Sequence, residues 1–206
     1  MSDQNSKIPT DEKEFMDDAA YCITHCNGPC CKHYAVVVSP FDLRRIMENI
    51  PPMDINRFIT FHQGVNDTQD EYPTVRIQGE EFYLGLQKEP QTHACVFETG
   101  IGICGIHTFS PLVCKLYPWA MDSNGDITYL EHVLCNHRFP TDDPESTKAN
   151  MRQFWDELEQ TKKLILEWNE QYGDNPDYGA KEFLQFVNCW RDSDLPIHFS
   201  RYSDDD

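Results

Sequence analysis

The sequence predicts one α+β domain, in which short strands and short helices surround a cysteine cluster and a helical part follows. Three observations predict it. Short β-branched runs alternate with Gly, Pro and Asn turns up to about residue 140. A long segment after Asp143 has apolar residues at helical spacing. Eight of the nine cysteines precede residue 140. We expect a disordered N-terminus (1–10), a metal-binding cysteine region (11–140), C-terminal helices packed on the same domain (141–202) and an acidic tail (203–206).

The N-terminal elements follow from capping and breaking residues. A helix is predicted from Asp11 to Cys26, with acids in its first turn, and Asn27-Gly28-Pro29 ends it. Residues 33–38 read as a short strand. Ser39 and Pro40 open a second helix that runs to about residue 49. Pro51-Pro52 ends this helix, and we expect a further short helix over residues 54–62.

Turn residues divide the middle of the chain. Residues 74–78 and 81–87 predict two paired strands around a Gly79-Glu80 turn, and residues 95–97 a third strand. The stretch 100–105 is a Gly-rich turn, and Ser110-Pro111 precedes a short helix that carries Cys114. Residues 123–126 predict a hairpin turn followed by a strand over 127–130.

Two helices are predicted in the C-terminal part. The first begins at Asp143-Pro144-Glu145 and ends at Gly173. Its apolar stripe consists of Met151, Trp155, Leu158, Ile165, Trp168 and Tyr172. The second covers residues 180–190, with Phe183, Phe186 and Val187 facing inward. Cys189 lies in this apolar pattern, and we expect it to be a small buried hydrophobic residue.

Composition restricts the partners and the compartment. The chain carries 17 basic and 35 acidic residues, a net charge of -18, which repels nucleic acid and anionic lipid. The first twenty residues contain no apolar signal segment, and the longest aliphatic run, Ala35 to Val38, is too short to span a membrane. We therefore expect a cytoplasmic protein. In a reducing compartment, clustered cysteines are more often ligands or catalytic residues than disulfides.

The cysteines form two groups that predict a metal centre. Cys22 and Cys26 lie one helical turn apart, and the turn at Gly28-Pro29 can return Cys30 or Cys31 to the same place. Adjacent cysteines in an extended segment point in opposite directions, so these two are expected to have different roles. The predicted ligands are Cys22, Cys26, Cys30, Cys31, Cys95, Cys104, Cys114 and Cys135.

Thiolates at close quarters repel one another unless a cation neutralises them. Zinc would take tetrahedral sulfur or nitrogen ligands, whereas an iron–sulfur cluster of the 4Fe–4S type would take about four thiolates that stand further apart. The varied spacing favours the cluster and leaves zinc as the alternative. Eight thiols would serve two centres, or one centre with spare thiols.

These residues resemble a known family. Cys22, Cys26 and Cys30-Cys31, followed by Cys95-Val96-Phe97, Cys104-Gly105-Ile106-His107 and the block Pro111 to Trp119, are similar to the YkgJ-like cysteine-cluster family. Its members are described as zinc- or iron-chelating domains. The block resembles the family pattern Arg-Pro-x-x-Cys-Arg-x-Tyr-Pro-Phe, but Ser110 and Lys115 stand where the family has arginine. The family also has two residues between its first cysteines, where this chain has three.

The resemblance covers roughly residues 20–140 and extends to the cysteine module of flagellin lysine-N-methylases. It implies metal or cluster binding in a redox or protein-modification setting, with a protein as partner or substrate. A lysine methyltransferase-like enzyme that uses the cluster and a structural zinc interaction module are the two alternatives. No catalytic residue and no nucleotide-binding motif is identified. Five histidines near the cysteines are more often surface residues than ligands: His25, His33, His107, His132 and His137.

Overall fold

The computed structural model describes residues 28–63, 72–99, 102–130, 134, 141, 143–190 and 195–201. Its elements are α2 (Pro29–His33), α3 (Pro40–Asn49), η2 (Ile55–Arg57), β1 (Ile59–Gln63), β2 (Val75–Ile77), β3 (Glu80–Leu86), η3 (His107–Phe109), α4 (Leu112–Leu116), β4 (Trp119–Met121), β5 (Ile127–Tyr129), α5 (Pro144–Gln171), α6 (Ala180–Phe186) and β6 (Phe199–Arg201). The predicted N-terminal disorder, the helix of residues 11–26 and the acidic tail lie outside the described residues.

The fold is of the α+β class, as the sequence predicted. Four strands form one sheet in the order β2-β3-β1-β6, and β4 and β5 form a separate hairpin. The neighbours β2-β3 and β3-β1 are antiparallel, whereas β6 joins β1 in parallel, with Phe61 opposite Phe199. The sheet therefore ends on β6, a strand that the C-terminal segment supplies. Its Phe199 pairs with Phe61 of β1, which lies far earlier in the chain.

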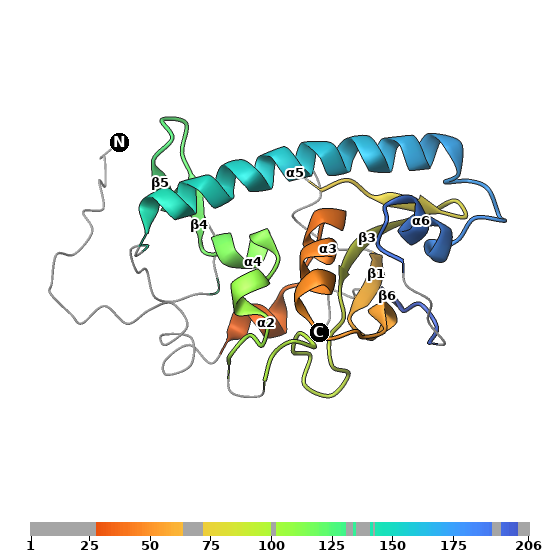
Figure 1. The fold of residues 1–206 in the computed structure, drawn as a ribbon, viewed down its shortest axis with the longest axis horizontal. Helices are drawn as coiled ribbons and strands as arrows, with labels where there is room; N and C mark the ends of the chain where they lie inside the picture. Colours follow the sequence, from red (N-terminus) through yellow and green to blue (C-terminus); the bar gives the residue numbers. More distant parts are fainter. Residues whose placement is uncertain are drawn as a thin grey trace, which may run out of the picture.

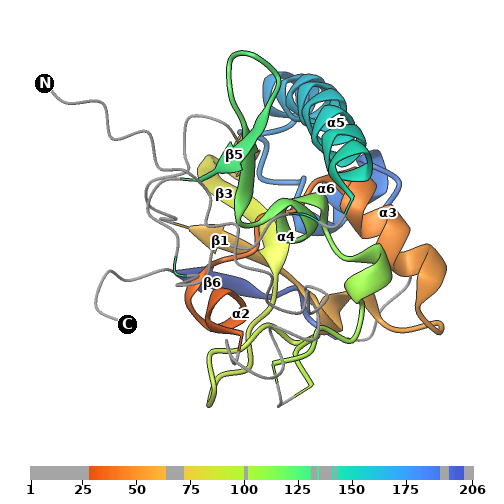
Figure 2. The ribbon, with the colours of Figure 1, turned by 90° about the vertical axis from the view of Figure 1, so that its left-hand side faces the viewer.

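Helix α5 extends along one side of the molecule, from the β4–β5 hairpin at one end to α6 at the other (Figures 1 and 2). Side-chain hydrogen bonds fasten it to β2. The Trp168 indole N–H donates to the Arg76 carbonyl at 2.8 Å, and the Asn169 amide both accepts from the Arg76 N–H and donates to the Thr74 carbonyl. Because β2 is an edge strand, these bonds satisfy backbone groups that the sheet leaves unpaired.

The apolar stripe of α5 is confirmed at most of its positions. Met151, Leu158, Ile165 and Trp168 are buried, and Tyr172 stacks on Tyr178. Trp155 is the exception, because 41% of its surface remains exposed. The expectation that Trp155 faces the core was therefore wrong, and the helix buries a stripe that is narrower there than its sequence pattern suggested.

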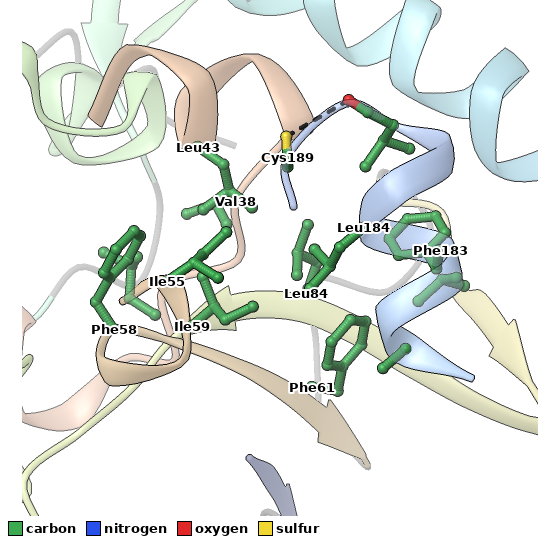
Figure 3. Close-up of a cluster of buried hydrophobic side chains, with 14 of the residues drawn as sticks. Val38, Leu43, Ile55, Phe58, Ile59, Phe61, Leu84, Phe183, Leu184 and Cys189 are labelled. Carbon is green, nitrogen blue, oxygen red and sulfur yellow. Dashed lines mark hydrogen bonds between the residues drawn. The ribbon is translucent and has the colours of Figure 1, made fainter. Parts of the chain in front are cut away.

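The main core lies between the sheet, α3 and α6 (Figure 3). Phe61 on β1 is fully buried, and its ring contacts Phe183 of α6 and Phe199 of β6. The Cys189 thiol donates to the Val187 carbonyl at 3.5 Å and to the Pro40 carbonyl at 3.3 Å. Cys189 is fully buried, which confirms the expectation that it packs as a small hydrophobic residue.

Helix α3 and the β4–β5 hairpin were predicted correctly, since local signals specify both. Ser39 and Asp42 form a reciprocal capping box at the start of α3, and Pro40 occupies its first turn. Asp122 accepts from the backbone N–H groups of Asn124 and Asp126 and so shapes the hairpin turn.

Several predicted elements were wrong. Residues 33–38 are not a strand: His33 ends α2, and Val37 makes an isolated bridge to Gly85. The helix expected over residues 54–62 is one 3₁₀ turn followed by β1. The β2–β3 turn lies at Gln78-Gly79, one residue earlier than predicted, and the strand expected at residues 95–97 is reduced to a bridge between Lys88 and Cys95. Helix α6 ends at Phe186 rather than at Trp190.

No helix among the described residues combines the length and the apolar character that crossing a membrane requires.

Candidate metal centre

Four of the eight predicted ligands come together from three separate segments of the chain. Cys31 lies on α2, Cys95 and Cys104 lie on the loops between β3 and η3, and Cys114 lies on α4. Cys30 precedes Cys31 on the same short helix. Cys22, Cys26 and Cys135 lie outside the described residues, so their predicted role is untested.

A backbone hydrogen bond joins the early and late cysteine groups directly. The Cys95 N–H donates to the Cys31 carbonyl at 2.8 Å. Beside it, the Lys88 ammonium donates to the Lys32 carbonyl at 2.6 Å, and the backbone of Lys88 forms an isolated antiparallel β-bridge with Cys95. These bonds hold the C-terminal half of α2 against the segment that follows β3. Residues separated by about sixty positions are thereby neighbours, as the two-group pattern predicted.

Gly28 makes a second approach between these groups possible. Its φ angle of 60° lies in the left-handed region, and a Cβ placed there would meet the Gly102 Cα at 3.4 Å. Glycine avoids the strain of this conformation. Gly28, which lies within the first cysteine group, therefore abuts the turn that carries Cys104.

The loop of Cys104 is closed by hydrogen bonds across its turn. Glu98 pairs with Cys104 in an isolated bridge, and the Glu98 carboxylate accepts from the Gly102 N–H at 2.6 Å. The Gly105 N–H donates to the Phe97 carbonyl at 2.8 Å. Cys95 and Cys104 therefore lie at the two ends of one closed turn, although eight residues separate them in the sequence.

Helix α4 is positioned by a buried carboxylate on α3. Asp42 accepts from the Leu112 N–H at 3.0 Å, which is the first backbone donor of α4. Asp42 also accepts from the Ser39 N–H and hydroxyl and from Arg45, and the Arg45 guanidinium forms two bonds to Glu157 of α5. Because α4 has only five residues, this external acceptor sets where Cys114 lies.

The four thiols lie close enough to influence one another's ionisation. Burial raises the pKa of Cys95 to about 12, and the neighbouring Cys31 and Cys104 add to this effect. Burial also raises the pKa of Cys104. The protein packed around Cys114 raises its pKa well above the ordinary value, with further contributions from Cys95, Cys104 and Cys31, although Cys114 is exposed at the surface. Burial and mutual repulsion together favour neutral thiols in the absence of a cation.

Cys31 differs from the other three thiols. A hydrogen bond from the Cys30 side chain lowers the pKa of Cys31 to about 7, against the opposing effect of burial. Lys32 and Lys88 lower it further, while Glu98 raises it. The two adjacent cysteines lie on a helix and not on the extended segment that the sequence predicted, and the Cys30 thiol donates to Cys31. Their separate roles stay a prediction.

Sulfur chemistry at this place fits a metal, whereas the geometry does not form a site for a single ion. Cys31, Cys95, Cys104 and Cys114 are all free thiols. Within the described ranges, no three cysteine, histidine, aspartate or glutamate side chains form a group that could hold one metal ion.

The other side chains that the sequence singled out have ordinary structural positions. His33 and His107 are exposed, while His25, His132 and His137 lie outside the described residues. Trp119 is buried with Leu116 and Met151, so it packs in a small second core. Tyr117 makes an edge contact with Tyr34, with ring centroids 5.6 Å apart.

Sequence reasoning missed the charged residues that position the thiols. No sequence motif surrounds Lys88. Its position beside the cysteines is visible only in the structure, through its β-bridge to Cys95 and its hydrogen bond to the Lys32 carbonyl. Asp42 carried a usable signal, because Ser39 and an acid three residues later form a capping-box pattern. That pattern predicts the start of α3, but it does not predict the bond to α4.

No protein-family model matches this chain, and searches of curated proteins and of solved structures likewise gave no match.

Proposed function

We propose that this chain is a metal-binding protein that holds an iron–sulfur cluster through Cys31, Cys95, Cys104 and Cys114. One observation carries the proposal: the hydrogen bond from the Cys95 N–H to the Cys31 carbonyl, which brings two cysteine groups together that lie far apart in the sequence. Zinc is the second candidate metal. Cys22, Cys26, Cys30 and Cys135 are proposed as further ligands, to the same centre or to a second one.

The donor set supports a metal centre, and the varied spacing of the cysteines along the chain favours a cluster over a single ion. All four sulfurs are free, they lie on three segments, and each segment is fastened by hydrogen bonds that do not involve a thiol. Preformed backbone positions lower the ordering cost of binding a metal. When bound, an iron–sulfur cluster supplies one-electron transfer or substrate polarisation at this place.

The surroundings also supply charge compensation. A cluster held by four thiolates carries net negative charge, and Lys32 and Lys88 both act electrostatically on Cys31. Lys88 lies at the junction of the two cysteine groups, where its ammonium is held by the Lys32 carbonyl at 2.6 Å. We propose that these two lysines stabilise the anionic thiolates of the loaded protein.

The biological setting that we propose is redox chemistry or protein modification, in the cytoplasm and with a protein partner. The likeness to the YkgJ-like cysteine-cluster family supports metal binding, and its extension to flagellin lysine-N-methylases supports a methyltransferase-like activity as the alternative. Binding of S-adenosylmethionine, measured by calorimetry on the metal-loaded protein, tests this alternative. Failure to bind would remove it and would leave the metal proposal intact.

Metal analysis of anaerobically purified protein tests the proposal. We expect iron and acid-labile sulfide in equal amounts, together with a broad visible absorption. Zinc without sulfide would support the structural zinc module instead, and a protein that retains neither metal after anaerobic reconstitution would refute metal binding altogether.

Serine variants assign the ligands. Cys31→Ser, Cys95→Ser, Cys104→Ser and Cys114→Ser are each expected to lose most of the bound metal. Cys189→Ser is the control, because Cys189 is a free thiol as well but is buried in the main core, where a hydroxyl can still donate to the Pro40 carbonyl. Equal metal loss in the control would show that metal retention reports folding rather than ligation.

A further inference from the structure

A cavity of about 350 Å³ opens beside the β2–β3 turn, and none of its lining residues is a cysteine. Its walls come from strands at both edges of the four-stranded sheet. Ile77, Gln78, Glu80 and Phe82 belong to the β2–β3 hairpin, while Phe199 belongs to β6 at the other edge. A volume of this size is at the lower end of the range for small-ligand sites, which begins at about 300 Å³.

Two aromatic rings form the apolar wall. Phe82 and Phe199 meet edge to face, with ring centroids 5.1 Å apart, and Phe199 also stacks on the buried Phe61. Phe199 nevertheless leaves 47% of its surface exposed. A phenyl ring that is anchored on one side and open on the other offers its π-system to a ligand, and such rings attract cations.

The polar rim contains one charge and two amides. Among the described lining residues, Glu80 is the only ionisable side chain, and the Gln63 amide donates to its carboxylate at 3.4 Å. Gln78 supplies the second amide, and Ser200 a hydroxyl. The part of the lining that the structure describes holds no lysine, arginine or histidine, so an anionic ligand would meet a carboxylate there. The net charge of -18 on the whole chain further favours the approach of a cation.

The turn that forms the cavity edge is strained and held in place. Gln78 has a φ angle of 53°, in the left-handed region that a side chain disfavours. The Gln78 side-chain amide donates from Nε2 to the Pro176 carbonyl at 3.0 Å, and the backbone N–H of Gly79 donates to the Gly173 carbonyl at 2.9 Å. An asparagine or glycine would fit this turn with less strain. A glutamine kept there against its backbone preference is consistent with a role for its side chain at the rim.

We infer that this cavity binds a small organic cation with an alkylated ammonium group. The head group contacts the Phe82 and Phe199 rings, and the Glu80 carboxylate neutralises its charge. This site is independent of the metal centre, so neither result decides the other.

Choline and its neutral isostere 3,3-dimethylbutan-1-ol are the probes, with binding to the full chain measured by ligand-observed NMR. We expect saturable binding of choline and much weaker binding of the alcohol. Glu80→Gln keeps the shape of the rim and removes its charge, and Phe199→Leu keeps an apolar side chain and removes the ring. Each is expected to weaken choline binding about two- to fivefold, the range for exposed cation–π and charge contacts. Glu81→Gln is the matched control, because Glu81 is an exposed neighbour on β3 that does not line the cavity.

A short lysine-containing peptide is a second probe, which shows whether the site also takes the primary ammonium of a side chain. Binding of choline with loss in Glu80→Gln and Phe199→Leu, but not in Glu81→Gln, supports the site, whereas binding of the peptide without binding of choline would overturn it. Equal binding of choline and the alcohol would overturn it, and so would a failure of both cations to bind or an equal effect of all three variants. Unchanged thermal unfolding of the variants confirms that a loss of binding is not a loss of fold.

Discussion

His62 should make the stability of this protein depend on pH in a range where most buried side chains do not titrate. It lies on β1 with 2% of its surface exposed. Its Nε2 is 3.3 Å from the Leu86 carbonyl, which can only accept, so Nε2 carries the hydrogen. Its Nδ1 is 2.7 Å from the Ser200 hydroxyl and therefore accepts from it. This arrangement uses a neutral imidazole.

Burial lowers the pKa of His62 from 6.5 to about 4, and the nearby Lys88 and His198 lower it as well, against the effect of the Leu86 carbonyl. The unfolded chain therefore binds a proton on this residue at a higher pH than the folded chain does. The stability that this residue contributes is fully present above pH 6.5 and is lost as the pH falls from 6.5 toward 4. Between about pH 7.5 and about pH 5, linkage predicts a loss of about 2 kcal/mol from this residue.

Urea unfolding of the wild type and of His62→Gln at both pH values measures this loss. Glutamine can accept from Ser200 and donate to Leu86, but it does not titrate. The wild type should lose about 2 kcal/mol more than the variant on acidification, whatever the difference between them at neutral pH. If the two chains lose equal stability, His62 does not remain neutral in the folded state and the reasoning is wrong.

Two further substitutions, each with a control, test the packing around the sheet and around α4. Gly85→Ala should lower the free energy of unfolding by about 2 to 3 kcal/mol, because the new Cβ would lie 2.4 Å from His62 Cδ2. Gly125→Ala, in open space but at a φ of 82°, should cost only about 1 kcal/mol, and equal losses in urea unfolding would contradict the steric argument. Asp42→Ala should cost about 3 kcal/mol, since it leaves the buried donors around it without their acceptor, whereas the exposed Asp156→Ala should change the unfolding midpoint little. A small effect of Asp42→Ala would show that α4 is positioned by other contacts.

Local signals explain which elements were predicted correctly. The capping box at Ser39, the turn around Asn124 and the long helical stripe after Asp143 each act within a few residues, so the sequence alone reveals them. The failures occur where distant contacts decide. Residues 59–63 read as part of a helix, and they form a strand because β3 and β6 pair with them on both sides.

For the candidate site, sequence spacing predicted that the two cysteine groups meet, and the structure places Cys31 beside Cys95. The ligand role of these cysteines stays a prediction. Sequence spacing could not predict that Cys30 and Cys31 lie on a helix, nor which charged residues accompany them. Those features depend on bonds between segments that are far apart in the chain, such as Lys88 to Lys32 and Asp42 to Leu112.

The sequence by itself determined the residue chemistry of this protein: thiols in two groups, an acidic surface and strong local caps and turns. Only the tertiary structure decided which thiols are neighbours, that a buried carboxylate places α4, and that His62 is neutral. The physical reason is the sequence separation over which each interaction acts. Capping and turn formation involve residues a few positions apart, whereas burial and long-range hydrogen bonding exist only after the chain has folded.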